Sequence, residues 1–72
     1  MAHGRHRVKI QYDEKADLLY LRLDRRPQDV LNKRVTEDIV LDVGREDKIV
    51  GIEIQNASKN LDLTQFPFEK VG

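Results

Sequence analysis

The chain has 72 residues, no cysteine, and 13 basic against 13 acidic side chains, so its formal net charge is zero. A domain this small buries only about 60% of the surface that its unfolded chain exposes, and no disulfide or thiolate metal site can stabilise it. The charges alternate in sign along the chain, which disfavours a general nucleic-acid-binding surface. We therefore expect one domain, residues 1–72, that gains stability by oligomerisation.

No membrane or export segment is evident. No apolar run approaches the roughly 20 residues that cross a bilayer. Residues 1–7 (MAHGRHR) lack the apolar stretch of a signal peptide. A cytoplasmic location without membrane contact is therefore expected.

Two alternating segments open the chain and predict a pair of strands. In residues 8–12 every second residue is apolar, as in a half-buried strand. Residues 13–17 form a polar turn rich in aspartate. Residues 18–23 are apolar on one face, and Leu18 and Tyr20 add apolar groups to the other, so both faces of this strand are expected to be covered.

A loop and a hairpin follow. Residues 24–29 contain a proline and predict a loop, and basic residues near 33–36 predict an edge strand. The alternating runs 39–43 and 49–54 predict a hairpin. Its apolar residues share a face if Leu41 pairs with Val50, which leaves a four-residue loop, or if the register slips by two.

The C-terminal part changes in character after this hairpin. A short helical turn is expected after Asn56 or Ser58, both good N-caps. The apolar residues beyond it are too many for a solvated tail, so the segment 60–72 is expected to fold back on the sheet or to cross to a second subunit. We predict a mainly β small domain, an antiparallel meander of four to five strands with a short C-terminal helical turn. Residues 8–59 form its core.

A sheet with apolar groups on both faces needs more cover than this chain supplies, so a homodimer is expected. The second face of the sheet, the C-terminal segment, or both would make the contact. The predicted interface residues are Leu18, Tyr20, Ile49, Phe66 and Phe68.

The acidic residues of the chain could form a chemical site or could serve structural roles. The cluster Asp13, Glu14 and Asp17 could bind a metal, but the spacing of a calcium loop is absent and backbone capping is the favoured interpretation. The first hairpin register places Asp38 opposite Glu53, with Asp42 nearby, as in an acid pair. These carboxylates are interpreted as part of a solvated face.

Two groups of basic residues allow the same two interpretations. His3 and His6 could chelate a metal only if helical, and they precede the first strand. A second set could touch phosphate but is interpreted as edge protection: Arg25, Arg26, Lys33 and Arg34. Because no nucleophile with a base and no phosphate loop is present, the sequence predicts neither an enzyme nor a cofactor or metal site.

Separated segments of the chain nevertheless resemble a known family. The run YDEKADLLYLRL at 12–23 precedes IVLDV at 39–43, IVGIEI at 49–54 and ASK at 57–59. This pattern resembles the small prokaryotic domain-of-unknown-function family numbered 2283. The resemblance covers residues 8–59 and implies no catalytic residues. Because some members are encoded beside toxin-like proteins, it implies an antitoxin-like or partner-binding role.

Three classes of function therefore stay open. The first is a non-catalytic protein-interaction module, possible partners being a second copy or a small protein such as a toxin. The second is a ligand- or metal-binding protein that uses the carboxylates of Asp13, Asp17, Asp42 and Glu53. The third is a weak nucleic-acid binder, although nucleic acid is not the expected partner.

Overall fold

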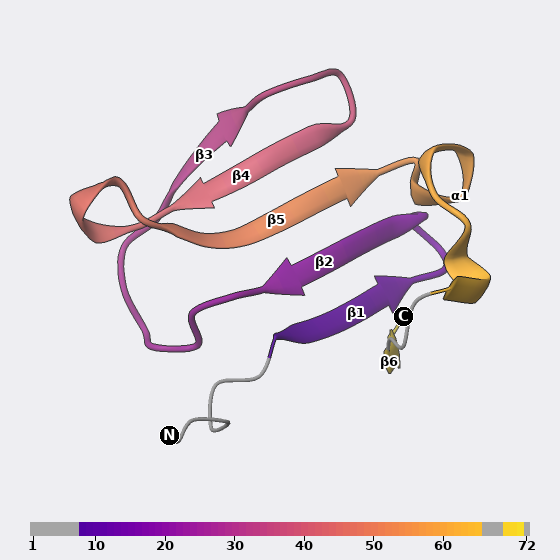
Figure 1. Ribbon diagram of the computed structural model, residues 1–72, viewed down its shortest axis with the longest axis horizontal. Helices are drawn as coiled ribbons and strands as arrows, with labels where there is room; N and C mark the ends of the chain where they lie inside the picture. Colours follow the sequence, from indigo (N-terminus) through magenta and orange to yellow (C-terminus); the bar gives the residue numbers. More distant parts are fainter. Residues whose placement is uncertain (1–7, 66–68, 72) are drawn as a thin grey trace.

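The computed structural model describes residues 8–65 and 69–71. These residues form one sheet with a short helix and two short 3-10 turns (Figure 1). The elements follow in chain order: β1 (Lys9–Asp13), β2 (Leu18–Arg22), β3 (Leu31–Arg34), β4 (Ile39–Val43), η1 (Arg45–Asp47), β5 (Ile49–Gln55), α1 (Ala57–Asn60), η2 (Leu63–Gln65) and β6 (Glu69–Val71).

The strands lie in the order β3-β4-β5-β2-β1-β6, and β1 to β5 pair antiparallel throughout. The prediction of a mainly β domain with an antiparallel sheet and a short helix is confirmed. The order departs from a simple meander at one place, because β2 pairs with β5 and not with its chain neighbour β3. The long 23–30 connection makes this possible by carrying the chain to the far edge of the sheet (Figure 1).

The predicted strands agree with the structure except near the edges. The third strand covers residues 31–34, two residues before the predicted 33–36, and all four of its residues are exposed. At the opposite edge, residues 69–71 pair parallel with β1. This part of the C-terminal segment therefore folds back on the sheet.

The hairpin register is the second of the two that the alternation allowed. Ile39 pairs with Ile54 and Leu41 with Ile52, so the pairing of Leu41 with Val50 is wrong. A β-bulge between Asp42 and Val43 accommodates the shift. A longer turn closes the hairpin, in which the Gly44 amide donates to the Lys48 carbonyl at 2.7 Å.

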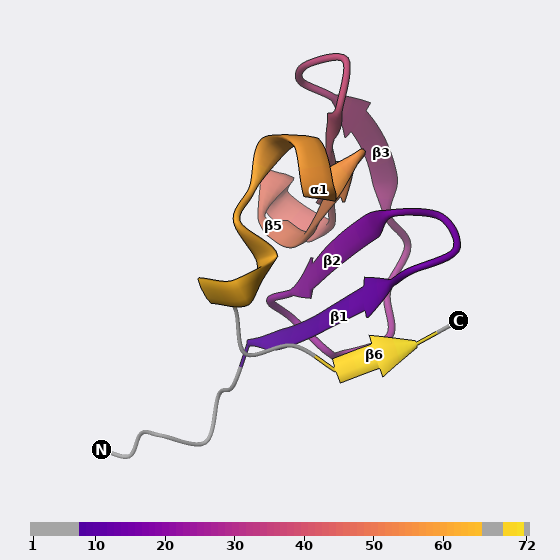
Figure 2. The same ribbon diagram turned by 90° about the vertical axis from the view of Figure 1, so that its right-hand side faces the viewer.

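One face of the sheet is apolar, and α1 covers only one end of it. Figure 2 shows α1 and η2 together on one side of the strands. Tyr12 and Leu19 of the sheet form a buried cluster with Ala57 of α1, and Leu19 and Ala57 are fully buried. Partly buried apolar residues surround this cluster: Ile10, Leu21, Ile54, Leu61 and Leu63. This cluster lies at the α1 end, and two further buried apolar residues, Val40 and Val50, lie outside it.

The other end of this apolar face is open. Because side chains alternate along a strand, Val8 and Leu23 lie on the apolar face, next to the ends of β1 and β2. Leu31 and Ile49 both pair with Val43, so they lie on the same face at the same end of the sheet. These four side chains are between 40% and 76% exposed. We refer to Val8, Leu23, Leu31 and Ile49 as the open end. Among the residues of this end of the apolar face, Val50 is buried, but these four are not.

Candidate functional site

The turn between β1 and β2 is joined to α1 by one carboxylate. The Tyr12 hydroxyl donates to Asp17 Oδ1 at 2.7 Å. The Ser58 amide donates to the same oxygen at 3.0 Å, and the Ser58 hydroxyl donates to Oδ2 at 2.7 Å. Asp17 therefore caps the first turn of α1 from a distant part of the chain. We call these three residues the latch.

The backbone around the latch requires residues that tolerate a left-handed conformation. Asp17 has φ of 53° and Asn56 has φ of 51°, a region that aspartate and asparagine adopt more readily than most residues. Asn56 precedes α1, as predicted, but its side-chain amide donates to Asp38 Oδ1 at 2.8 Å and does not cap the helix. The capping group comes from Asp17 instead.

Hydrogen bonds in the latch shift two titrations in opposite directions. The bond to Asp17 raises the pKa of Tyr12 to about 12. The bonds from Tyr12 and Ser58 lower the pKa of Asp17. Both shifts favour a neutral phenol beside a charged carboxylate, so the latch is a stable donor–acceptor arrangement and not a proton-transfer pair.

The opposite face of the sheet, the polar face, is centred on Tyr20. Its hydroxyl donates to Asp42 Oδ2 at 2.9 Å, and the Asn32 amide donates to Asp42 Oδ1 at 2.6 Å. To reach Asp42 on β4, the Tyr20 side chain passes from β2 across β5. Its phenol end lies over Gly51, where an added Cβ would collide with the hydroxyl oxygen and lie 3.0 Å from Cζ. The ring therefore lies along the sheet, and Gly51 makes room for it.

Carboxylates make one side of this ring acidic. Asp42 is only 6% exposed, and Tyr20 and Asn32 satisfy its two oxygens. Burial raises the pKa of Glu53, and a hydrogen bond with Asp42 and its charge raise it further. Burial and the bond to Asp42 raise the pKa of Tyr20 as well.

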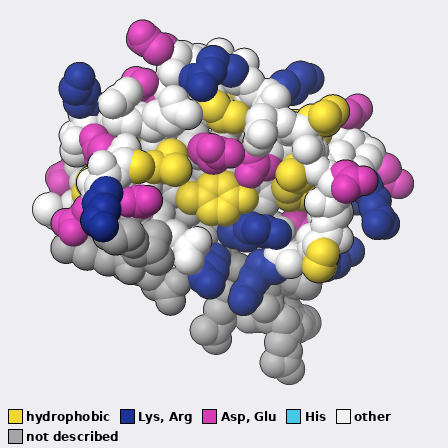
Figure 3. Space-filling view, turned by 180° about the vertical axis from the view of Figure 1, so that it is seen from behind, with side chains coloured by type: hydrophobic (Ala, Val, Ile, Leu, Met, Phe, Trp, Pro, Cys, Tyr) yellow, Lys and Arg dark blue, Asp and Glu magenta, His cyan; other side chains and the backbone are white. Residues whose placement is uncertain are grey.

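Cations gather on the other side of the ring. A shallow pocket of about 210 Å³ is lined by Lys9, Gln11, Tyr20, Arg22 and Arg25. We call it the basic pocket, because its lining contains three cations and no acid. Figure 3 shows this face with an apolar ring at its centre, acidic side chains above it and basic side chains below. Tyr20 thus separates regions of opposite charge.

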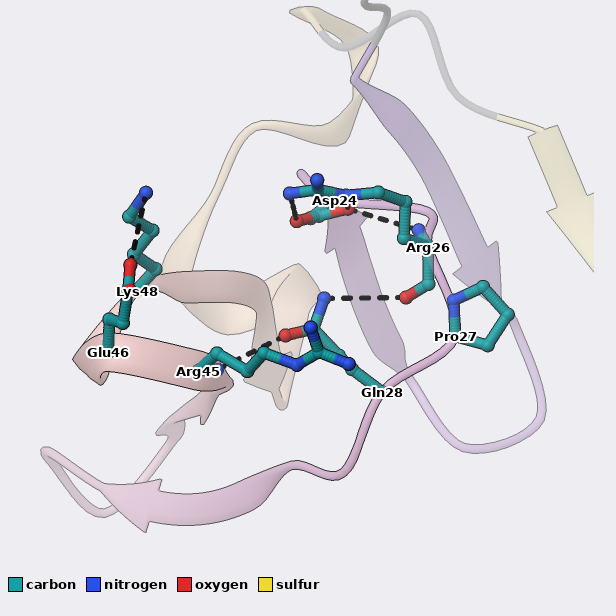
Figure 4. A pocket seen from close by; sticks show the side chains of 7 residues that line it. All are labelled: Asp24, Arg26, Pro27, Gln28, Arg45, Glu46 and Lys48. Carbon is teal, nitrogen blue, oxygen red and sulfur yellow. Dashed lines mark hydrogen bonds and ion pairs between the residues drawn. The ribbon is translucent and has the colours of Figure 1, made fainter.

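A second pocket, of about 340 Å³, lies between the 23–30 connection and η1 (Figure 4). Gln28 joins its two walls, because its amide nitrogen donates to the Arg26 carbonyl at 3.4 Å and its oxygen accepts from the Arg45 amide at 3.2 Å. Arg26 pairs with Asp24 at 2.6 Å, and Lys48 lies 3.7 Å from Glu46. The Arg26 bonds hold the pKa of the Asp24 carboxyl well below its usual range. The charged side chains that line this second pocket largely compensate one another.

The region that carries the sheet and the latch matches a family model described as "Protein of unknown function (DUF2283)", over residues 9–58. The chain belongs to this family. No curated protein and no solved structure matches the chain. In this DUF2283 chain, the YDEKAD and AS segments that suggested the family contain the three latch residues, so part of the signature has a structural role.

The carboxylates considered as a ligand site are divided between two places. Asp13 Oδ1 accepts the amides of Lys15 and Ala16 in the turn, in agreement with the capping interpretation, and Asp17 belongs to the latch. Asp42 and Glu53 lie on the polar face. The described residues contain no group of three or more histidine, cysteine or acidic side chains placed to hold a metal.

Two groupings made from the sequence are corrected. Glu53 pairs with Val40, so the expected placement of Asp38 opposite Glu53 is wrong; Asp38 instead accepts bonds from Asn56 and Asn60. The predicted basic set is also dispersed. Arg25 lines the basic pocket and Arg26 pairs with Asp24, whereas Lys33 and Arg34 are adjacent on β3 and so point to opposite faces.

The predicted interface residues fall in three places. Leu18 and Tyr20 are half-buried on the polar face, and Ile49, 44% exposed, belongs to the open end. Phe66 and Phe68 lie outside the described residues. Within the described part of the chain, no helix is both long enough and apolar enough to cross a bilayer.

Sequence reasoning missed Lys9, Arg22 and Asn32 as members of the polar face. A signal for two of them was available, because the β1–β2 hairpin places Lys9 directly opposite Arg22 and Gln11 opposite Tyr20. No comparable signal pointed to Asn32. Its contact with Asp42 depends on the pairing of β3 with β4.

Proposed function

We propose that this DUF2283 protein is a non-catalytic interaction module that binds a second copy of itself through the open end of its apolar face. The observation that carries the proposal is the row of four exposed apolar side chains beyond the cover of α1. Four of the six large apolar residues that are exposed in the described part of the chain belong to this row. Grouping of this kind marks an interaction surface, whereas single exposed apolar residues do not.

The small core supports the same conclusion. Leu19 is the only large side chain that is fully buried among the described residues. Domains of this size need additional apolar burial or another form of stabilisation. Packing a second sheet on the open end, at the roughly 10 Å spacing of stacked sheets, would bury the residues that α1 leaves exposed.

A second copy is a suitable partner because the surface is complementary to itself. A two-fold contact places the same patch on both subunits, and an apolar patch satisfies this condition. The zero net charge of the chain adds no overall repulsion between copies. Pairing through the β3 edge is less favourable, since Lys33 and Arg34 are exposed there.

The antitoxin-like role implied by the family resemblance would use the same surface. A toxin-like partner would replace the second copy on the open end, because one apolar patch cannot be covered by both. A heterologous complex and the homodimer are therefore expected to exclude each other.

The proposal is tested by measuring the mass of the protein in solution, using size-exclusion chromatography coupled to light scattering at protein concentrations of about 10–100 µM. The parent chain is expected to have twice its single-chain mass of 8.4 kDa, and the double variant Leu23→Glu, Leu31→Glu is expected to be a folded monomer. Val30→Glu is the matched control, since Val30 is 45% exposed but precedes β3. A monomeric parent protein would contradict the proposal.

The same experiment distinguishes this contact from the one predicted through the second face. Leu18→Lys places a charge on the polar face and leaves the open end unchanged. Loss of the dimer in Leu18→Lys, with retention in the double variant, would move the interface to the polar face. Far-UV circular dichroism of each variant establishes that it is folded.

A further inference from the structure

We propose that the polar face binds nucleotides, either free or as units of a single-stranded nucleic acid, with the base against the Tyr20 ring and the phosphate at Lys9, Arg22 and Arg25. The two parts of this site are the ring that crosses β5 over Gly51 and the basic pocket beside it. The site lies on the face opposite the proposed dimer contact, so neither proposal depends on the other.

The ring has the placement of a stacking platform. The bond to Asp42 and the space above Gly51 hold it along the sheet surface, so its orientation is fixed before a ligand arrives. Aromatic rings on an open sheet face are a common means of stacking bases of single-stranded RNA. Because Asp42 fixes the hydroxyl, stacking would not require the ring to change its position.

The cations beside the ring supply the phosphate contacts. Lys9 and Arg22 are direct cross-strand partners, so their side chains lie on the same face of the sheet. Arg22 donates through Nε to the Asp24 carbonyl at 2.9 Å, which holds its guanidinium in place. Arg25 makes no hydrogen bond or ion pair with other described residues, so its guanidinium can contact a phosphate.

The size and charge of the site restrict the ligand. A pocket of about 210 Å³ is smaller than those that enclose drug-sized molecules, so the ligand is held from one side. The acidic residues beyond the ring, Asp42 and Glu53, repel a phosphate there. They favour an orientation with the phosphate at the basic pocket and the base over the ring.

Binding can be measured by tyrosine fluorescence, because the chain has two tyrosines and no tryptophan, and by amide chemical shifts. The probes are AMP, inorganic phosphate and a ten-nucleotide single-stranded RNA, each at 20 mM and 200 mM salt. We expect AMP and the RNA to shift the amides of Lys9, Arg22 and Arg25, and to bind at least about fivefold more tightly than phosphate. Tighter binding of the RNA than of AMP would identify a strand as the preferred source of the nucleotide.

Matched variants separate the two parts of the site. Tyr20→Leu is expected to weaken AMP binding at least about fivefold. Tyr20→Phe, which retains the ring but loses the bond to Asp42, is expected to weaken it less. The double variant Arg22→Gln, Arg25→Gln is expected to abolish most of the salt dependence. Arg26→Gln is its control, since Arg26 lines the other pocket and pairs with Asp24.

Two results would overturn the proposal. One is the absence of any shift with AMP and RNA at 20 mM salt. The other is phosphate binding as tight as that of AMP with no effect of Tyr20→Leu, which would show a simple anion site. The melting curve of each variant establishes that loss of binding is not loss of folding.

Discussion

The two faces of this sheet are stabilised by different interactions. The apolar face is held by packing, chiefly at the end where α1 covers Tyr12 and Leu19. Within residues 8–65 and 69–71 no helix covers the polar face, and its central contacts are hydrogen bonds that converge on Asp42. A small sheet can thus be ordered on both faces although its described part has only one small packed cluster. The exposed remainder of each face is then available for binding.

The largest expected effect is on the packed end of the apolar face. Leu19→Ala removes the fully buried side chain and should reduce the free energy of unfolding by about 2–5 kcal/mol. A domain of this size is stable by only roughly 4–11 kcal/mol. Urea denaturation at 25 °C measures the loss, and Leu19→Val provides a milder variant that stays folded.

The matched change at the open end is Leu31→Ala, at a side chain that is 76% exposed. In a dilute solution of the monomer, Leu31→Ala should lower the free energy of unfolding by less than about 0.5 kcal/mol. Equal losses for Leu19→Ala and Leu31→Ala at low concentration would contradict the division of the apolar face into a packed and an open end.

The next effect concerns the polar face. Gly51→Ala forces the Tyr20 ring away from its position over β5 and should lower the free energy of unfolding by about 1–3 kcal/mol. In combination with Tyr20→Leu, the same change should cost much less, because the colliding group is absent. A double-mutant cycle by thermal or urea unfolding measures this coupling. Additive losses would show that the ring does not depend on Gly51.

The latch links the cover to the sheet, and Asp17→Asn should lower the urea midpoint of unfolding at pH 7, because a neutral amide accepts the bonds from Tyr12 and Ser58 less strongly than a carboxylate does. The pKa of Asp17 is lowered from 3.8 in the folded state, so its contribution is full above 3.8 and is lost as the pH falls through the lower folded value. The difference in stability between Asp17→Asn and the parent protein should therefore shrink below about pH 3.8. Asp29→Asn is the control, since Asp29 is an exposed carboxylate in the 23–30 connection, away from the latch.

The smallest effect is a stabilisation. The pKa of Glu53 is raised above 4.5 in the folded state, so its contribution is full below 4.5 and is lost as the pH rises through the folded value. Glu53→Gln removes a charge diagonal to Asp42 and should stabilise the protein by about 0.5 kcal/mol at pH 7. The gain should disappear at pH 4 in thermal unfolding. A gain that persists there would mean that charge repulsion is not its cause.

Much of the fold could be predicted because alternation is a local property. Residues 39–43 and 49–54 were recognised as strands, and the turn at 13–17 as a polar turn, from side-chain pattern alone. The start of α1 followed in the same way, from residues that favour helix termini. The edge strand β3 begins two residues before its predicted start, because exposed edge residues have no apolar period that marks their position.

The candidate sites depended on contacts between distant segments. The sequence determined which residues share a face within each strand, since successive side chains alternate. Only the tertiary structure decided that β2 lies beside β5, that a bulge places Gly51 opposite Asp42, and that α1 covers one end of a face. A slip of two residues preserves the apolar pattern and yet changes every cross-strand partner. The physical reason is that periodicity specifies which face a side chain occupies, whereas the register depends on the turn and on contacts between strands, which the pattern within one strand does not contain.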